Sequence, residues 1–315
     1  TDDAAKAAKG MVLNIMMRGI NLEEYSGYYD TQLEYSYNVD FNPRTMVGDD
    51  YSNPRERNYG NNHIDGPEAL HGTHVAGIVG ATNNGTGMDG ICKTAQLMII
   101  RCVPDGDERD KDVANAIRYA ADNGARVINM SFGKSHSPYK DVVDEAVMYA
   151  ESKGVLLVHA AGNDSKDVDV KDNFPTPRYL NGKTCSTWLE IGASDNSIDH
   201  LSADFSNYGD KTVDIYAPGV DIYATILDNG FGPLSGTSMA SPVTAGVAAA
   251  ILSYYPNLSA VQVRDIIIKS GISYKKHKVV MPGDEEKKIK FGKLSKSGKV
   301  VNLYEALKLA EKMSK

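Results

Sequence analysis

Two histidines, three positions apart, stand at the start of a run of small and β-branched residues. His71 and His74 lie in ALHGTHVAGIVGA, residues 69–81. Such a pair can bind a metal ion, transfer protons or fill a core. A histidine that transfers protons needs a group to deprotonate and a carboxylate to orient its ring. A catalytic role for His71 therefore requires both partners nearby in the folded chain.

A candidate for the first partner is Ser238, in GTSMASPVTAGVAAA, residues 236–250. A glycine-rich turn here enters a helix of small residues, and Pro242 falls in the first turn, where its missing N–H costs nothing. Free backbone N–H groups at a helix N-terminus stabilise negative charge on a nearby oxygen. The same segment also fits a capping serine on a buried alanine-rich helix, so both readings stay open from these residues alone.

A third polar residue, Asn163, follows the apolar run VLLV in VLLVHAAGN, residues 155–163. Ligands of open α/β sheets bind outside the carboxyl ends of the strands. The Asn163 amide is therefore placed to donate a hydrogen bond to an oxyanion. An asparagine in an ordinary turn after Gly162 explains the segment equally well when it is taken alone.

Six segments together resemble the signature blocks of the subtilisin-like serine peptidases, in the order of that family: HGTHVAGIVGATNNGTG, VINMSFG, AAGN, FSNYG, VDIYAPG and GTSMASP. They cover roughly residues 69–255. The resemblance implies that His71 is the general base, Ser238 the nucleophile and Asn163 the oxyanion donor, with the Ser238 backbone N–H as a second donor. His74 is then expected to be a packing residue.

The resemblance also implies a cleft for an extended peptide. One segment would pair with the substrate by strand addition, and another would line the pocket for the side chain before the scissile bond. Residues 173–179 would shape the far side of that pocket. The expected substrate-binding residues are Ser131, Phe132, Gly133, Ala160, Ala161, Gly162 and Thr237.

The orienting carboxylate is not found where the family has it. Its aspartate ends an apolar strand in a D-[ST]-G turn upstream of the histidine. No such turn precedes His71, and Asp40, in YNVDFNP, has neither the apolar run nor the glycine. Subtilisin-like enzymes of the Bacteroidetes resemble this chain across residues 32–62 and carry a long insertion between their Asp and His blocks. We therefore expect the aspartate on a segment upstream of Thr1.

The apolar pattern predicts an α/β fold with an open, mainly parallel sheet and helices on both faces. Strands without polar alternation are expected in the apolar runs at 95–103, 126–132, 155–163, 187–195 and 213–225, between amphipathic helices. Ser259 is expected to cap a helix, and residues 285–299 to form a solvated hairpin or loop. We divide the chain into an arm, residues 1–68, which begins with a helix and ends irregularly, and a peptidase domain, residues 69–315, lacking its first strand.

Composition excludes several classes. A net charge of -7 over 315 residues speaks against nucleic acid, no apolar run could span a membrane, and the three cysteines form no metal or disulfide pattern. No cofactor is required; TNNGTG, residues 82–87, resembles a structural calcium loop of some family members, but metal-free turns of this kind are commoner. The family resemblance implies a polypeptide substrate and an extracytoplasmic location.

Two other functions remain to be weighed against the peptidase. A peptide-binding pseudopeptidase would explain the missing aspartate but not the retention of His71, Ser238 and Asn163. A metal hydrolase would use His71 and His74, but the sequence has no HExxH spacing and no third ligand within reach.

Overall fold

The computed structural model describes residues 33–34, 38, 40–66, 69–104, 106 and 108–315. The helix expected over residues 1–18 lies outside these residues. Among the described residues, no helix is both long and apolar enough to cross a membrane.

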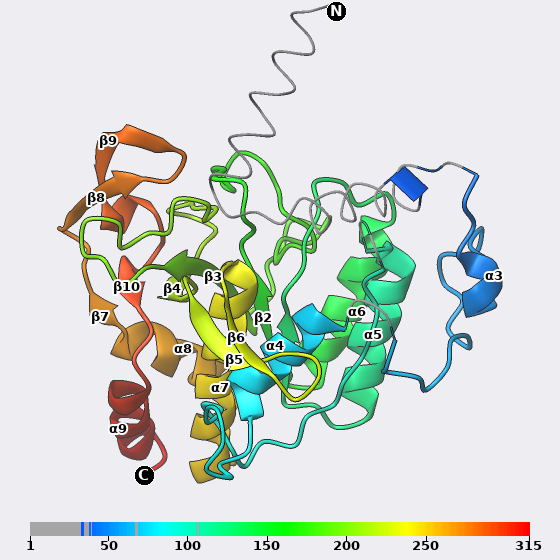
Figure 1. The fold of residues 1–315 in the computed structure, drawn as a ribbon, viewed down its shortest axis with the longest axis horizontal. Coiled ribbons are helices and arrows are strands. Elements are labelled where there is room, and N and C mark those ends of the chain that lie inside the picture. Colours follow the sequence, from blue (N-terminus) through cyan, green and yellow to red (C-terminus); the bar gives the residue numbers. More distant parts are fainter. Residues whose placement is uncertain (1–32, 35–37, 39, 67–68, 105, 107) are drawn as a thin grey trace, which may run out of the picture.

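The centre of the molecule is a six-stranded sheet in the order β1-β2-β3-β4-β10-β7 (Figure 1). The strands from β1 to β10 are parallel and β7 is antiparallel at one edge. This confirms the predicted open, mainly parallel sheet. The strands are β1 (Val127–Met130), β2 (Leu156–Ala160), β3 (Trp188–Ser194), β4 (Ile215–Pro218), β7 (Ile272–Ser273) and β10 (Lys299–Val300).

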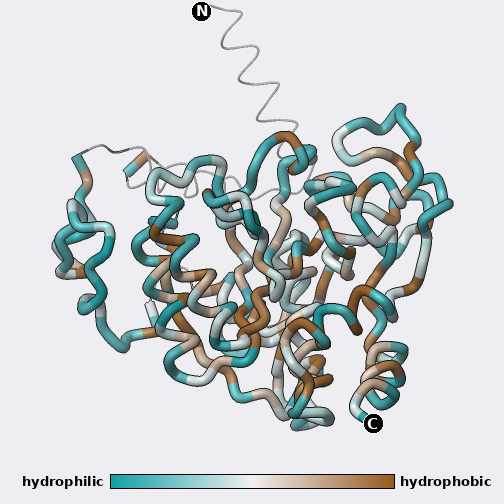
Figure 2. The backbone as a smooth tube through the Cα atoms, turned by 180° about the vertical axis from the view of Figure 1, so that it is seen from behind, coloured by the Kyte–Doolittle hydropathy of each residue, from teal (hydrophilic) through white to brown (hydrophobic). Residues whose placement is uncertain are grey.

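Helices cover both faces because successive strand residues point to opposite sides. In β2, Leu156 and Val158 belong to the core with α7, α8 and α9, whereas Leu157 belongs to the core with α5 and α6. Hydrophobic segments accordingly concentrate in the middle of the molecule (Figure 2). The helices are α5 (Asp110–Asp122), α6 (Lys140–Ser152), α7 (Thr237–Tyr254), α8 (Ala260–Ser270) and α9 (Leu303–Met313).

The remaining elements surround this body. Ser259 caps α8, as predicted, and Gln262 completes a capping box with it. The solvated hairpin predicted for residues 285–299 is confirmed only up to Lys290, which ends an exposed hairpin strand. The rest of the prediction is wrong, because Phe291 and Leu294 are buried in a hydrophobic cluster and Lys299 belongs to the central sheet. These outer elements are α3 (Arg44–Val47), α4 (Leu70–Gly80), the pair β5 (Ile222–Thr225) and β6 (Phe231–Leu234), the pair β8 (Lys278–Met281) and β9 (Asp284–Lys290), and the short 3-10 helix η2 (Phe291–Lys293).

One predicted strand is wrong. Residues 95–103 form no strand, although their apolar run favoured one. The side chains of Leu97, Met98 and Ile99 are 43%, 40% and 46% exposed, so this segment is not buried as an inner strand would be. A strand forms only where a neighbour supplies its hydrogen bonds, and the described part of the chain provides none beside this segment.

The irregular arm packs against α5 through buried charges. Lys111 of α5 donates hydrogen bonds to Asp49, to the Asp50 carbonyl and to Glu56. Arg44 of α3 bonds both oxygens of Asp112. We call Arg44, Asp49, Glu56, Lys111 and Asp112 the anchoring cluster.

Candidate active site

Ser238 is the second residue of α7, at the end of the sheet where the parallel strands finish. Its hydroxyl donates a 3.2 Å hydrogen bond to the carbonyl of Ser131, and the Ser131 hydroxyl donates a 2.8 Å bond to the Ser238 carbonyl. Ser131 directly follows β1, so these two bonds tie the start of α7 to the segment expected to pair with substrate.

Asn163 is held in one orientation by Thr237. Its Oδ1 accepts two 2.8 Å hydrogen bonds, one from the Thr237 backbone N–H and one from the Thr237 hydroxyl. The Thr237 hydroxyl in turn accepts a 3.1 Å bond from the Gly162 N–H. Because Oδ1 is engaged, the amide nitrogen of Asn163 is the end that is available to a ligand.

Two donors converge beside Gly236. The point where a Cβ atom of Gly236 would lie is 3.4 Å from Asn163 Nδ2 and 3.6 Å from the Ser238 backbone nitrogen. Gly236 has φ +156°, a conformation that residues with a side chain rarely adopt, and it leaves this space open. Two N–H groups whose nitrogens lie within 3.6 Å of one point are close enough together to stabilise an oxyanion there.

His71 is the second residue of α4, which packs against α7. Its side chain reaches solvent, yet the protein around it lowers its pKa, and His74 lowers that pKa further. A lowered pKa keeps the imidazole neutral and able to accept a proton. The described residues form no hydrogen bond between His71 and Ser238, so the structure places the pair on adjacent helices without joining them.

His74 is fully buried, as expected of a packing residue. Its Nε2 lies 3.1 Å from the Gly232 carbonyl oxygen, while Nδ1 has no hydrogen-bond partner among the described residues. No group of three potential His, Cys, Asp or Glu metal ligands occurs in the described part of the chain. In the loop 82–87 the Thr86 N–H donates a 3.0 Å hydrogen bond to Asn84, and the Asn83 amide donates a 2.9 Å bond to Asp89, just beyond the loop.

No carboxylate contributes to the pKa of His71, whose shift comes from desolvation and His74. Asp40 is exposed, and its backbone N–H bonds the nearby Asn38 side chain. Within the residues that the structure describes, His71 therefore has no orienting carboxylate.

The segments expected to bind substrate lie side by side at the carboxyl ends of β1 and β2. Residues 131–133 continue β1, and Ala160 ends β2 before Ala161 and Gly162. The buried side chain of His159 joins the two segments: its Nε2 donates a 2.8 Å hydrogen bond to the Phe132 carbonyl, and Nδ1 lies 2.9 Å from Glu190. This contact was not expected from the sequence.

Asn207 supports the turn that carries Asn163. Its Oδ1 accepts bonds from the backbone N–H groups of Asp164 and Lys166, at 3.0 and 2.8 Å, and its Nδ2 donates to the Ala161 carbonyl at 2.8 Å. Sequence reasoning assigned Asn207 no role, although it lies in FSNYG, one of the recognised segments. The signal that could have identified it is an asparagine, a side chain that both donates and accepts hydrogen bonds, inside a recognised motif.

A serine at a helix N-terminus with two nitrogen atoms close by, on a parallel α/β sheet, is an arrangement typical of the class of the serine hydrolases. The chain matches the profile of the subtilase family, Peptidase S8, over residues 17–297. It therefore belongs to the subtilase family.

Relatives agree with this assignment. A thermophilic serine proteinase of Bacillus sp. (strain AK1) is 44% identical over 185 residues, 58% of this chain and 42% of the relative. Subtilisin BL of Lederbergia lenta is 37% identical over 204 residues, 64% of this chain and 70% of the relative. The matched regions thus range from less than half to about two thirds of the relatives' lengths.

Solved structures show the same fold. A mutant of the protease domain of PatA superposes with a TM-score of 0.63 at 27% identity, covering 80% of this chain and 84% of that one. Sphericase gives a TM-score of 0.60 at 30% identity, covering 70% of this chain and 75% of its own.

Proposed function

We propose that this chain forms the larger part of a serine endopeptidase that cleaves polypeptides through Ser238, His71 and an oxyanion hole made by Asn163 and the Ser238 N–H. The observation that carries the proposal is the convergence of Asn163 Nδ2 and the Ser238 nitrogen beside Gly236. Ser238 attacks the carbonyl carbon while His71 takes its proton. The amine leaves with that proton, and water then hydrolyses the acyl-enzyme.

A fluorophosphonate probe tests the nucleophile. We expect the probe to label Ser238 and labelling to disappear in Ser238→Ala. Ser235→Ala is the matched control, because its hydroxyl lies in the preceding turn and accepts a bond from the Asp221 N–H. Labelling that persists in Ser238→Ala would show that another residue reacts.

We further propose that the orienting carboxylate comes from an upstream strand that docks beside β1. Two features support this. Among the described residues β1 pairs only with β2, and three of its four residues are only half-buried, whereas every residue of β2 is buried. Parallel strands end at one edge of a sheet, so a carboxylate ending a strand beside β1 would lie near Ser131 and the start of α7.

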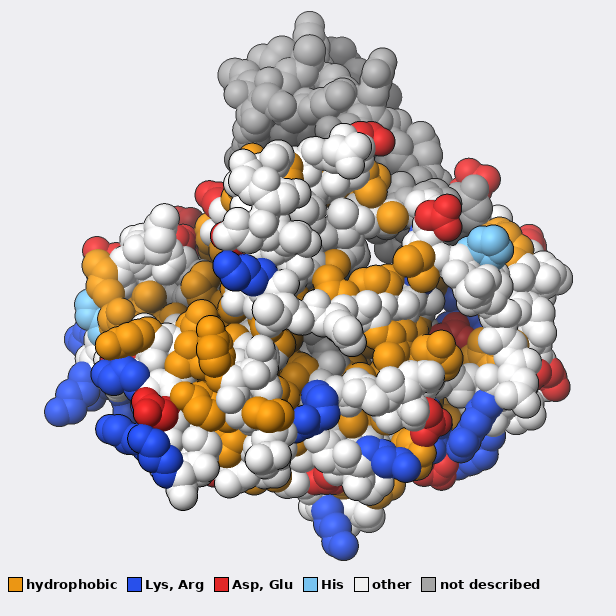
Figure 3. Space-filling model, turned by 90° about the horizontal axis from the view of Figure 1, so that it is seen from below, with side chains coloured by type: hydrophobic (Ala, Val, Ile, Leu, Met, Phe, Trp, Pro, Cys, Tyr) orange, Lys and Arg blue, Asp and Glu red, His pale blue; other side chains and the backbone are white. Residues whose placement is uncertain are grey.

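Exposed apolar side chains in the segment 95–103 also support an additional strand. Its exposed side chains Leu97, Met98, Ile99 and Val103, the last 38% exposed, are the apolar residues that an additional strand would cover. In Figure 1 this segment runs along the lower side of the molecule. Hydrophobic side chains gather at the surface on that side, which Figure 3 shows from below. In subtilisin, loss of the carboxylate alone lowers turnover about 3 × 10⁴-fold, so the chain without such a strand is expected to be nearly inactive.

Restoring the upstream coding region tests the docking proposal. We expect a D-[ST]-G segment there, a large gain in peptide hydrolysis, and a rise in the pKa of His71 measured by NMR titration, because a nearby negative charge favours the imidazolium. The Asp→Asn variant of that segment should keep the fold and lose both effects. An unchanged His71 titration would contradict the proposed strand.

A peptide-binding pseudopeptidase is the second candidate, favoured by the absence of a carboxylate at His71. It predicts no fluorophosphonate labelling even with the upstream region restored. A metal hydrolase instead predicts inhibition by chelators. The family resemblance supports an extracytoplasmic location, which fractionation of the native cells would test.

A further inference from the structure

His159 connects the two segments that are expected to bind substrate. It is the fourth residue of β2 and is fully buried. Its Nε2 lies 2.8 Å from the carbonyl oxygen of Phe132, and its Nδ1 lies 2.9 and 3.1 Å from the two carboxylate oxygens of Glu190. In the register of the sheet His159 stands between Met130 of β1 and Glu190 of β3. Three neighbouring strands therefore set the position of the imidazole.

Both nitrogens of this imidazole are used. A carbonyl oxygen only accepts hydrogen bonds, so Nε2 carries a proton and donates a bond to Phe132. Nδ1 faces a carboxylate oxygen, and a second proton must lie between these two atoms because both bear lone pairs. The Trp188 indole N–H donates a 2.8 Å bond to Glu190, and the Trp188 ring lies beside the imidazole with ring centres 5.3 Å apart. Glu190 and Trp188 thus hold His159 with its Nε2 directed at Phe132.

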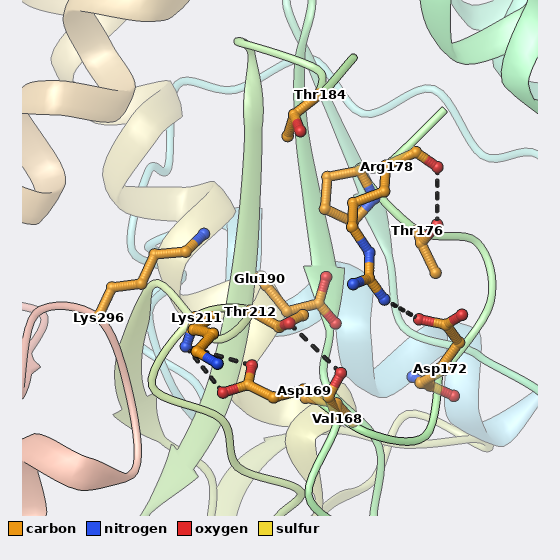
Figure 4. A pocket seen from close by; sticks show the side chains of 12 residues that line it. Val168, Asp169, Asp172, Thr176, Arg178, Thr184, Glu190, Lys211, Thr212 and Lys296 are labelled. Carbon is orange, nitrogen blue, oxygen red and sulfur yellow. Dashed lines mark hydrogen bonds and ion pairs between the residues drawn. The ribbon is translucent and has the colours of Figure 1, made fainter. Parts of the chain in front are cut away.

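The Glu190 carboxylate is bonded by only two side chains among the residues that the structure describes. These are His159 and Trp188. Figure 4 shows Glu190 in the wall of a cavity of about 170 Å³, where the Arg178 charge of the same wall is already paired with Asp172. The buried carboxylate therefore serves to hold His159, and loss of either side chain leaves the other without its partner.

The bond from His159 fixes the peptide group between Phe132 and Gly133. This peptide bond is trans, so its C=O and N–H point in opposite directions. Because the Phe132 carbonyl is directed inward to the imidazole, the Gly133 N–H is directed away from it. Successive carbonyls of an extended segment alternate in direction, and the preceding carbonyl, that of Ser131, accepts the bond from the Ser238 hydroxyl. The Gly133 N–H therefore lies on the side of Ser238.

We propose that His159 is a positioning residue for peptide cleavage: held by Glu190, it fixes the Phe132–Gly133 peptide group so that the Gly133 N–H faces an extended substrate on the side of Ser238. This deepens, and rests on, the proposed peptidase function. Without the imidazole the Phe132 carbonyl loses its donor, and the cost of leaving it unpaired favours rotation of the peptide group.

The loss should fall on substrates that pair with residues 131–133 and spare small ones. Ser238 and Asn163 have supports of their own, since Ser131 bonds the Ser238 carbonyl and Thr237 bonds the Asn163 amide oxygen. Neither bond involves His159. A probe that reaches the nucleophile without pairing to this segment should therefore react as before.

Two kinds of probe separate these effects. A small alkyl fluorophosphonate labels an active-site serine without a peptide backbone, whereas a tripeptidyl diphenyl phosphonate carries a backbone that can pair with residues 131–133. The protein is expressed from its full reading frame, and the rate of Ser238 labelling by each probe is followed by mass spectrometry. The informative quantity is the rate with the peptidyl probe divided by the rate with the small probe.

Two double variants differ only at residue 159. Both contain Glu190→Gln, which removes the buried charge and keeps an acceptor for the Trp188 N–H. His159→Leu/Glu190→Gln removes the donor to Phe132, and His159→Gln/Glu190→Gln supplies an amide N–H in its place. We expect the rate ratio to fall about 3- to 10-fold in the first variant, the effect of one hydrogen bond, and to recover in the second. Urea unfolding checks that both variants fold.

Ser259→Ala is the control for a loss of stability as such, because it removes a cap from α8 without touching β1 or β2. It should leave the rate ratio unchanged. An unchanged ratio in the folded His159→Leu/Glu190→Gln protein would overturn the proposal, as would equal losses in both double variants. If neither probe labels Ser238 in the wild type, the peptidase function itself fails, whereas labelling by both probes with a ratio that ignores residue 159 refutes only the role of His159.

The wild type offers a second readout that does not depend on whether the variants fold. Nitrogen NMR of selectively labelled histidine distinguishes protonated from unprotonated ring nitrogens. We expect a proton on Nε2 of His159, because the Phe132 carbonyl cannot donate. An unprotonated Nε2 would remove the bond on which the positioning of the peptide group rests, and the proposal with it.

Discussion

Removing the Lys111 ammonium is expected to release the arm from the peptidase domain. The Lys111 and Asp49 side chains are both fully buried, and they form an ion pair; Glu56 supplies a second carboxylate 2.8 Å from Nζ. Lys111→Ala leaves the Asp49 carboxylate buried with Arg44 as its remaining cation. Breaking a buried pair by deleting one partner costs about 3–5 kcal/mol. We expect the free energy of docking of the arm against α5 to become less favourable by this amount.

Arg55 provides a control within the same arm. It also forms two ion pairs, with Asp141 and Glu145, but its side chain is 53% exposed and those of its partners are 49% and 44% exposed. Solvent-exposed pairs contribute little to stability, because water and salt screen them. Arg55→Ala therefore removes as many ion pairs as Lys111→Ala at a fraction of the cost.

Hydrogen exchange followed by mass spectrometry and limited proteolysis both measure the loss of docking within the arm itself. We expect faster exchange and earlier cleavage over residues 44–59 in Lys111→Ala, and near wild-type behaviour in Arg55→Ala. The double variant Lys111→Met/Asp49→Leu should recover much of the loss, because well-packed apolar residues can replace a buried ion pair. Equal effects of the two single alanine variants would refute the assignment of arm docking to burial of the cluster.

Three further outcomes follow from individual contacts. Hydrogen bonding to Arg44 lowers the pKa of Asp49 from 3.8 to about 2. A shift of this size contributes about 2 kcal/mol to the docking of the arm. This contribution should persist above pH 3.8 and disappear as the pH falls through about 2, and hydrogen exchange of the arm in acid would measure the loss. Ser259→Ala removes the cap of α8 and should cost about 0.5–2 kcal/mol in urea unfolding. His159→Ala leaves the buried carboxylate of Glu190 without its imidazole partner and should cost at least about 3 kcal/mol in the same assay.

Local patterns predicted the helices and inner strands well. Ser259 with Gln262 three residues later is a capping signal that needs only neighbouring residues, and it was realised in full. The apolar runs at β2 and β3 predicted buried parallel strands because no polar residue interrupts their faces, apart from His159 and Glu190. The contact between His159 and Glu190 could not be predicted from the sequence, because only the register of β2 against β3 brings the two residues opposite each other.

Predictions that depended on non-local partners fared differently. Lys111 has the sequence context of an exposed helix residue, but the arm buries it completely. Residues 95–103 have the composition of an inner strand but form none. The burial of Lys111 and the conformation of residues 95–103 both depend on which distant part of the chain packs against them. The residue pattern along the segment carries no information on that partner.

The parts of the site that the structure does assemble share one physical property: their positions are fixed by hydrogen bonds within the peptidase domain. Thr237 orients Asn163, and Ser131 ties the start of α7 to β1. None of these contacts involves a strand beside β1. The proposed oxyanion donors can therefore be preorganised without the proposed upstream carboxylate. His71, with a lowered pKa and no hydrogen bond to Ser238, would depend on that carboxylate for its orientation. On this reasoning the upstream strand would control proton transfer at His71 and leave oxyanion binding unchanged.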